Sequence, residues 1–109
     1  MKVITLHKRI SIGELFSHLQ QKLNPLFKEQ RQTDTELQVF QAGEAIDIAI
    51  PQLYEGALFQ IAINGTELWI TRNEHYVDDV NSLTIESILN ALFEDLTDDI
   101  RGTDLVQEG

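Results

Sequence analysis

The stretch FQIAINGTELWI, residues 59–70, decides the fold, because it predicts two β-strands joined by a tight turn. Two apolar runs flank Asn64 and Gly65, and Asn-Gly between alternating apolar residues is the strongest short-range signal for a hairpin. With these two residues as the loop, the directly opposed pairs are Ile63 with Thr66, Ile61 with Leu68, and Phe59 with Ile70. These side chains share one largely apolar face, which we expect to contact a helix layer.

Trp69, the only tryptophan in the chain, falls on the opposite face of this hairpin, where it faces Gln60. Three explanations are open. The ring lies across its strand neighbours under the C-terminal tail or residues 73–82, or it anchors a partner or self-association interface, where tryptophan often dominates the binding energy. In the third explanation the register is slipped by one residue, which turns the ring inward. The Asn-Gly turn argues against that slip.

Two amphipathic helices are predicted, one on each side of the strand meander. Ser11 and Glu14 form a capping box that begins the first helix, because each side chain can bond the other's backbone amide. Pro25 interrupts this helix and predicts a kink or a brief second helix to about residue 31. Thr84 is the expected cap of the last helix, whose apolar stripe runs to a stop at Gly102.

Three further strands are predicted at residues 2–7, 36–40 and 44–50, from their β-branched and apolar content. The implied order is β-α-β-β-β-β-α, and the apolar faces suffice for two layers. We therefore predict an α+β two-layer sandwich, in which an antiparallel sheet of about five strands carries two helices on one face. Residues 1–102 form its single domain, and residues 103–109 form a flexible C-terminal tail.

Composition excludes several classes of function. The chain has no cysteine, which removes disulfides, thiolate nucleophiles and cysteine zinc sites and fits the cytoplasm, where we expect the protein. No stretch approaches the ~20 apolar residues of a membrane span, and the first apolar run is too short for a signal peptide. No phosphate-binding glycine loop, HExxH or GxSxG motif occurs, and no cofactor is expected.

Charge is distributed unevenly along this chain of net charge −10. Residues 1–31 hold six bases and two acids, whereas residues 32–109 hold two bases and sixteen acids. Either the basic segment packs beside the acidic one, or an acidic face meets a basic partner. Direct binding to nucleic acid is disfavoured, because most of this surface would repel phosphates.

Acids gather at both ends of the last predicted helix. Besides Trp69, the candidate binding residues are these acids: Asp78, Asp79, Glu94, Asp95, Asp98 and Asp99. The last four crowd the final turns, where the helix dipole favours cations, and each exposed acid costs on the order of 0.3 kcal/mol there. Either they only keep the protein dispersed, or they contact a basic partner or imitate the phosphates of DNA.

His75 lies in a loop with three acids, Glu74, Asp78 and Asp79. A metal site or an acid–base pair could use such groups. One histidine with loop acids is an incomplete ligand set, however, so we assign no metal ligand and no catalytic residue.

These features favour a small acidic, non-enzymatic protein-binding module, an adaptor, chaperone or antagonist that binds a basic partner protein. One alternative is a nucleic-acid mimic that inhibits a DNA-binding protein. A second alternative is a small enzyme that uses the His75 loop. A homodimer through the Trp69 face of the sheet is also open, and no membrane partner is expected.

Overall fold

The computed structural model describes residues 2–96 and 106–107 of the chain. The elements in chain order are β1 (Lys2–Thr5), α1 (Ile12–Arg31), β2 (Gln38–Ala42), β3 (Ala45–Ala49), β4 (Phe59–Asn64), β5 (Glu67–Arg72), the 3-10 turn η1 (Glu74–Tyr76), α2 (Val80–Leu96) and β6 (Val106–Gln107). The strands form one sheet in the order β2-β3-β4-β5-β1-β6. Every neighbouring pair in it is antiparallel.

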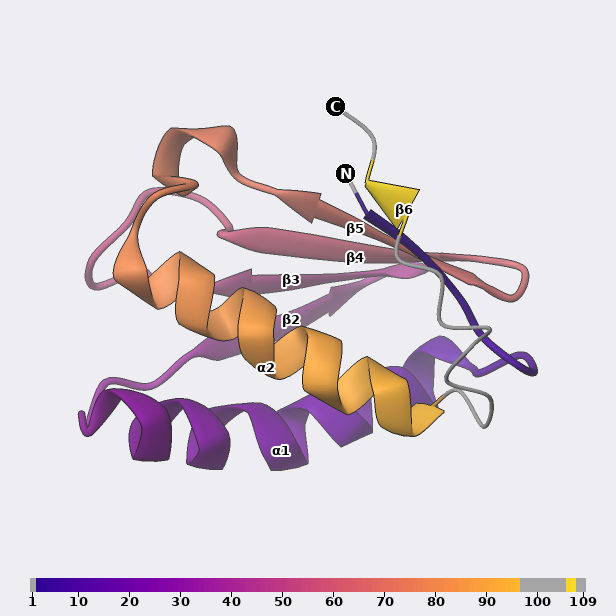
Figure 1. The fold of residues 1–109 in the computed structure, drawn as a ribbon, viewed down its shortest axis with the longest axis horizontal. Helices are drawn as coiled ribbons and strands as arrows, with labels where there is room; N and C mark the ends of the chain where they lie inside the picture. Colours follow the sequence, from indigo (N-terminus) through magenta and orange to yellow (C-terminus); the bar gives the residue numbers. More distant parts are fainter. Residues whose placement is uncertain (1, 97–105, 108–109) are drawn as a thin grey trace.

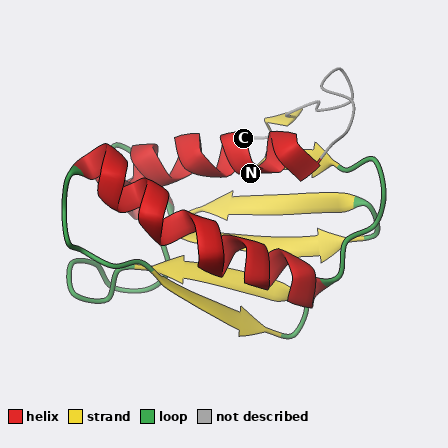
Figure 2. Cartoon of the chain, turned by 90° about the horizontal axis from the view of Figure 1, so that it is seen from below, coloured by secondary structure: helices red, strands yellow, loops and turns green. Residues whose placement is uncertain are grey.

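Both helices lie on the same face of the sheet (Figure 1). Figure 2, seen from below, looks through the two helices onto the strands behind them. The predicted α+β sandwich and its element order are therefore confirmed as far as α2, and the short strand β6 is an addition to them. The opposite face carries no helix among the described elements, and we call it the uncovered face.

One apolar core fills the space between the two layers. The helices contribute residues at helical spacing: Leu15, Leu19, Leu23 and Phe27 from α1, and Ile85, Ile88, Leu89, Leu92 and Phe93 from α2. The strands contribute alternate residues: Ile4, Ile46, Ile48, Phe59, Ile61, Leu68 and Ile70. Full burial of each such side chain is worth about 1.5–3 kcal/mol, so this core supplies the main driving force for the fold.

Helix α1 begins as predicted but is not interrupted. Glu14 N donates to Ser11 Oγ at 3.1 Å, and Ser11 N donates to the Glu14 carboxylate at 3.4 Å, which completes the capping box. Pro25 lies inside one helix that ends at Arg31, so the second of the two predicted alternatives, a separate short helix, was wrong. Leu23 and Phe27 on either side are fully buried, and their packing outweighs the ~3 kcal/mol that an interior proline costs.

The β4–β5 turn is displaced by one residue from the predicted turn. Asn64 pairs with Glu67, so Gly65 and Thr66 form the two-residue loop in place of Asn64 and Gly65. Gly65 has φ +65°, and Thr66 has no positive φ. This is the pattern of a type II′ turn, whose first loop position favours glycine.

The displaced turn changes the strand partners but not the faces. Ile61 pairs with Ile70, and Ile63 with Leu68, so the predicted pairing was wrong. Because the register shifts by an even number of positions, each residue stays on the face predicted for it.

Helix α2 begins four residues before the predicted cap. The Asp79 carboxylate accepts hydrogen bonds from the backbone amides of Asn81 at 2.8 Å and Ser82 at 3.4 Å. Asp79 is therefore the N-cap, and Thr84 lies inside the helix, where its hydroxyl donates to the Val80 carbonyl. Carboxylates are favoured at this end of a helix by its dipole.

Part of the predicted C-terminal boundary lies outside the described residues. Residues 97–105 and 108–109 are not among the described residues, so the predicted helix stop at Gly102 lies outside them. Within the predicted tail, Val106–Gln107 form β6, which pairs with β1. Neither α1 nor the described part of α2 is long and apolar enough to cross a membrane.

Candidate functional site

Trp69 lies on the uncovered face of the sheet. Its two neighbours in β5, Leu68 and Ile70, are buried against the helices, so strand alternation directs the indole to the other side. The ring is half-buried, and its N–H donates to the Glu67 carboxylate at 3.0 Å. The face predicted for Trp69 is confirmed, while Gln60, its predicted partner, pairs with Thr71 instead.

An apolar row crosses this face through Trp69. The strand register aligns five small or apolar residues from five strands: Ala42, Ala45, Ala62, Trp69 and Val3. The next row begins with Phe40 of β2, whose side chain is 48% exposed. Large contiguous apolar patches on a protein surface often mark interaction sites, so this row with Phe40 is the candidate site on the sheet.

The charged side chains of β1–β5 divide between the two faces. Lys2 and Arg72 lie on the helix side, where their nitrogens approach Glu86 of α2 at 3.1 and 3.3 Å. Asp47 and Glu67 lie on the uncovered face, in register with outward residues of the neighbouring strands. In the five long strands, therefore, the uncovered face carries carboxylates and no lysine or arginine.

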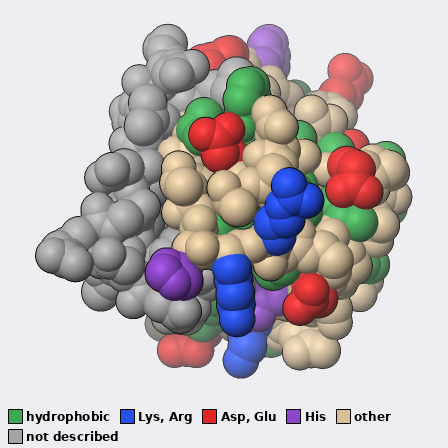
Figure 3. Space-filling view, turned by 90° about the vertical axis from the view of Figure 1, so that its right-hand side faces the viewer, with side chains coloured by type: hydrophobic (Ala, Val, Ile, Leu, Met, Phe, Trp, Pro, Cys, Tyr) green, Lys and Arg blue, Asp and Glu red, His purple; other side chains and the backbone are tan. Residues whose placement is uncertain are grey.

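Other bases lie outside the strands. His7, Lys8 and Arg9 form an exposed run between β1 and α1. Figure 3 views the end of the molecule near the β4–β5 turn, where lysine and arginine side chains lie among histidine and acidic ones. Of the bases in the first 31 residues, Lys2 and Lys28 pair with Glu86 and Glu36.

The predicted acidic residues are not equivalent. Asp79 caps α2 and also accepts a 2.6 Å hydrogen bond from the Tyr54 hydroxyl, so its carboxylate serves the fold. Asp78 and Glu94 are exposed. Asp95 lies in α2, but its side chain is not among those described, and Asp98 and Asp99 lie outside the described residues.

The His75 loop brings few of its polar groups together. His75 is exposed, its backbone N–H donates to Asn73 Oδ1 at 3.0 Å, and its ring contacts Tyr76 edge-on at 4.9 Å between centroids. Asp79 faces Tyr54 and the start of α2 instead. Within residues 2–96, no group of three or more histidines and acids could hold a metal ion.

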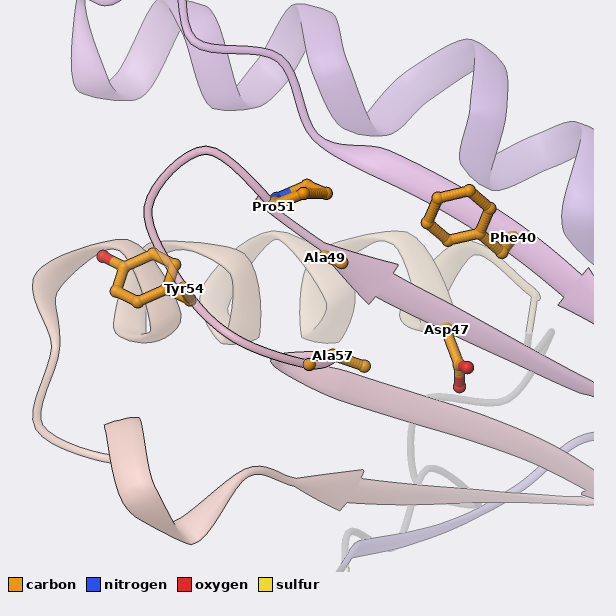
Figure 4. A pocket seen from close by; sticks show the side chains of 7 residues that line it. Phe40, Asp47, Ala49, Pro51, Tyr54 and Ala57 are labelled. Carbon is orange, nitrogen blue, oxygen red and sulfur yellow. The ribbon is translucent and has the colours of Figure 1, made fainter.

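A small hollow beside β2 was missed by the sequence reasoning. This cavity has a volume of about 270 Å³ (Figure 4). Its lining includes Phe40 of β2, Asp47 and Ala49 of β3, and Pro51 and Ala57 of the β3–β4 connection. The alternation within β2 and within β3 can predict that Phe40 and Asp47 each point away from the helices. Only the strand register shows that Phe40 and Asp47 are directly opposed.

Comparison of the chain with protein-family models, with curated proteins and with solved structures finds no match. The assignment of a function therefore depends on the surface described above.

Proposed function

We propose that this protein is a small non-enzymatic module that binds a basic partner protein through the uncovered face of its sheet, with Trp69 at the centre of the contact. The division of charge between the two faces supports it. The two strand bases lie on the helix side, where they pair with Glu86, so the charged side chains beside the apolar row on the strands are carboxylates. A partner with basic side chains around an apolar patch complements such a face.

The two kinds of group have different roles in binding. Trp69 offers a large ring already held by its bond to Glu67, so little side-chain freedom is lost when a partner covers it. Residues of this type often cost 2 kcal/mol or more when truncated in an interface. Asp47 and the other acids speed the encounter with a basic protein and make it sensitive to salt.

The first experiment compares Trp69→Lys with the control Leu83→Lys. Both variants replace an apolar side chain by lysine, but Leu83 is an exposed residue of α2 on the other layer. Immobilised wild-type protein is incubated with extract of the native cell. We expect a basic protein that the Trp69 variant fails to retain and the Leu83 variant still retains.

The second experiment uses that partner in purified form. Trp69→Ala should weaken binding by at least about thirtyfold, while leaving the unfolding midpoint nearly unchanged. Binding should weaken as salt is raised from low to physiological concentration. Because Trp69 is the only tryptophan, its fluorescence reports directly whether the partner covers this face.

Two results would contradict this function. Binding that Trp69→Ala leaves unchanged would remove the uncovered face as the site. A cooperative fold lost in Trp69→Ala would show that the ring serves stability instead. Release of the partner by DNA would favour the alternative of a nucleic-acid mimic.

A further inference from the structure

The outer edge of the sheet at β2 carries unpaired backbone groups. The carbonyl oxygen of Ile48 in β3 accepts a hydrogen bond from Leu58 N at 2.7 Å, on the side of β4. Backbone groups alternate along an antiparallel strand, so the residues on either side of Ile48 bond β2. Val39, which lies opposite Ile48, therefore directs its N–H and C=O away from the sheet. Gln41, two residues later, does the same.

The same edge is already closed at one point by a side chain. Leu37 lies two residues before Val39, so its backbone N–H and C=O point to the same side as those of Val39. Both of these groups bond the side-chain amide of Asn24 in α1. Leu37 N donates to Asn24 Oδ1 at 2.6 Å, and Asn24 Nδ2 donates to the Leu37 carbonyl at 3.0 Å. Asn24 thus makes the bonds that a neighbouring strand would make, and the edge beyond it is open.

Strand β2 has none of the usual features that prevent strand addition. Its sequence, QVFQA, has no charge and no proline, and most of its residues are exposed. Natural proteins usually place lysine, proline or a bulge on such an edge, because an open edge recruits another strand. An open edge of this kind is the structural requirement for binding a peptide by strand addition.

A side-chain pocket lies next to this edge on the uncovered face (Figure 4). Its volume of about 270 Å³ is below the ~300–1,000 Å³ of small-molecule sites, which suits a single side chain. Phe40 and Ala57 give it apolar walls, and Asp47 adds one carboxylate. Gln60 Nε2 donates to Asp47 Oδ1 at 3.1 Å, and no described lysine or arginine forms an ion pair with Asp47. Apolar walls with one unpaired carboxylate match the stem and the charged head of lysine or arginine.

Charge also argues against a second copy of this chain at the edge. If two β2 strands paired antiparallel about Phe40, Glu36 would lie opposite Glu44 of the other copy. Like charges opposed across two strands are destabilising, and the chain as a whole carries −10. A basic segment meets the opposite situation, because β2 is flanked by Glu44 on one side and by Glu36, which pairs with Lys28, on the other.

We propose, on the basis of the function proposed above, that the basic partner contributes an extended segment that adds to β2 as a further strand. Its backbone bonds the free groups of Val39 and Gln41. A lysine or arginine of the segment lies across the ring of Phe40 and sets its charged head at Asp47. Stacking of a cation on an aromatic ring adds to the ion pair at such a site.

The probe is a blocked synthetic peptide of about ten residues that alternates valine and arginine, the length of a long strand. Isothermal titration calorimetry measures its binding to the full chain. Two control peptides have glutamate in place of arginine, or N-methyl groups on alternate residues, which remove the donors that a strand needs. We expect binding of the first peptide and at least about tenfold weaker binding of both controls.

Two protein variants test the same contact from the other side. Gln41→Pro removes the free N–H at the edge while the bonds to β3 stay in place, and Gln41→Ala is its control because it keeps that N–H. Asp47→Asn removes the charge and keeps the shape. We expect Gln41→Pro and Asp47→Asn each to weaken peptide binding by roughly tenfold, and Gln41→Ala to leave it unchanged.

Equal binding of the N-methylated and unmodified peptides would overturn the proposal, and so would self-association of the chain that Gln41→Pro abolishes. The peptide controls keep the test decisive if Gln41→Pro does not fold. A partner that depends on Trp69 but binds Gln41→Pro normally would refute strand addition alone and leave the proposed function in place. A partner that binds the Trp69 variant and Gln41→Pro as well as it binds the wild type would refute both the proposed function and strand addition.

Discussion

At the scale of single residues, Tyr54 joins three parts of the chain. Its hydroxyl donates to Asp79 Oδ2 at 2.6 Å and accepts from Asn81 Nδ2 at 3.1 Å. Arg31 at the end of α1 donates to Asn81 Oδ1 at 3.0 Å. The Tyr54 ring also contacts Tyr76 edge-on, at 4.8 Å between centroids. These bonds fix the β3–β4 connection to the start of α2 and the end of α1.

This environment makes stability depend on alkaline pH. Partial burial raises the pKa of Tyr54 above its ordinary value of 10.0, and the bond to the Asp79 carboxylate raises this pKa further. The phenol of the unfolded chain ionises first as the pH rises, so the free energy of the unfolded state falls relative to that of the folded state. The contribution of Tyr54 to stability is complete below about pH 10 and is lost as the pH rises through its folded-state pKa.

We therefore expect Tyr54→Phe to flatten the loss of stability above about pH 10. At neutral pH it should cost about 1 kcal/mol through the lost hydrogen bonds. Urea unfolding over a pH series measures both effects. A variant as steeply pH-dependent as the wild type would show that Tyr54 is not the group responsible.

At the scale of elements, the β4–β5 hairpin gives a direct test of its turn. Gly65 has φ +65°, and a Cβ built on it meets nothing within 4 Å. Gly65→Ala should therefore cost about 1 kcal/mol for backbone conformation alone. Asn64 ends β4 and has no positive φ, so Asn64→Ala should change the free energy of unfolding by less than about 0.5 kcal/mol.

Urea unfolding of the two variants distinguishes the two possible turns. A turn on Asn64 and Gly65 would be of type I′, with positive φ at both positions, and both substitutions would then be costly. Equal large costs would therefore contradict the turn on Gly65 and Thr66.

The elements show which features a sequence alone can predict. The faces of the hairpin follow from strand alternation. They were predicted correctly despite the wrong turn, because the strand register shifts by an even number of residues. The turn itself is ambiguous, since Asn-Gly and Gly-Thr each offer a glycine to a two-residue loop. The start of α2 was missed because Asp79, its cap, stands among polar residues that resemble a loop. The separate helix after Pro25 was predicted wrongly because local propensity does not include the packing of Leu23 and Phe27.

The candidate surface shows the same limit. The side of the sheet that Trp69 occupies could be predicted from the pattern of β5. The opposition of Phe40 to Asp47, and the bond from Asn24 to Leu37, depend on which strands and helices meet. Such contacts join residues of different elements, and a periodic pattern within one element contains no information about them.

At the scale of the whole molecule, Glu86 compensates the two bases on the helix side of the sheet. Its carboxylate binds Lys2 of β1 and Arg72 of β5, and these ion pairs fix α2 to two strands of the sheet. The side chains of Lys2 and Glu86 are only 14% and 20% exposed. Pairs this sheltered lose more on disruption than surface pairs, because the remaining charges stay partly desolvated.

Glu86→Gln should therefore destabilise the fold by about 2 kcal/mol, below the ~3–5 kcal/mol for breaking a fully buried pair. The matched control is Glu36→Gln, which removes the pair with Lys28 where the glutamate side chain is 67% exposed. This control should cost less than about 1 kcal/mol. Urea unfolding at low and high salt measures both. Equal small costs would mean that solvent screens Glu86 as fully as Glu36, so that this carboxylate compensates the charges of Lys2 and Arg72 only weakly. Strand alternation would still place both bases on the helix side, but their less compensated positive charge would then weaken the salt-dependent attraction of a basic partner to the molecule.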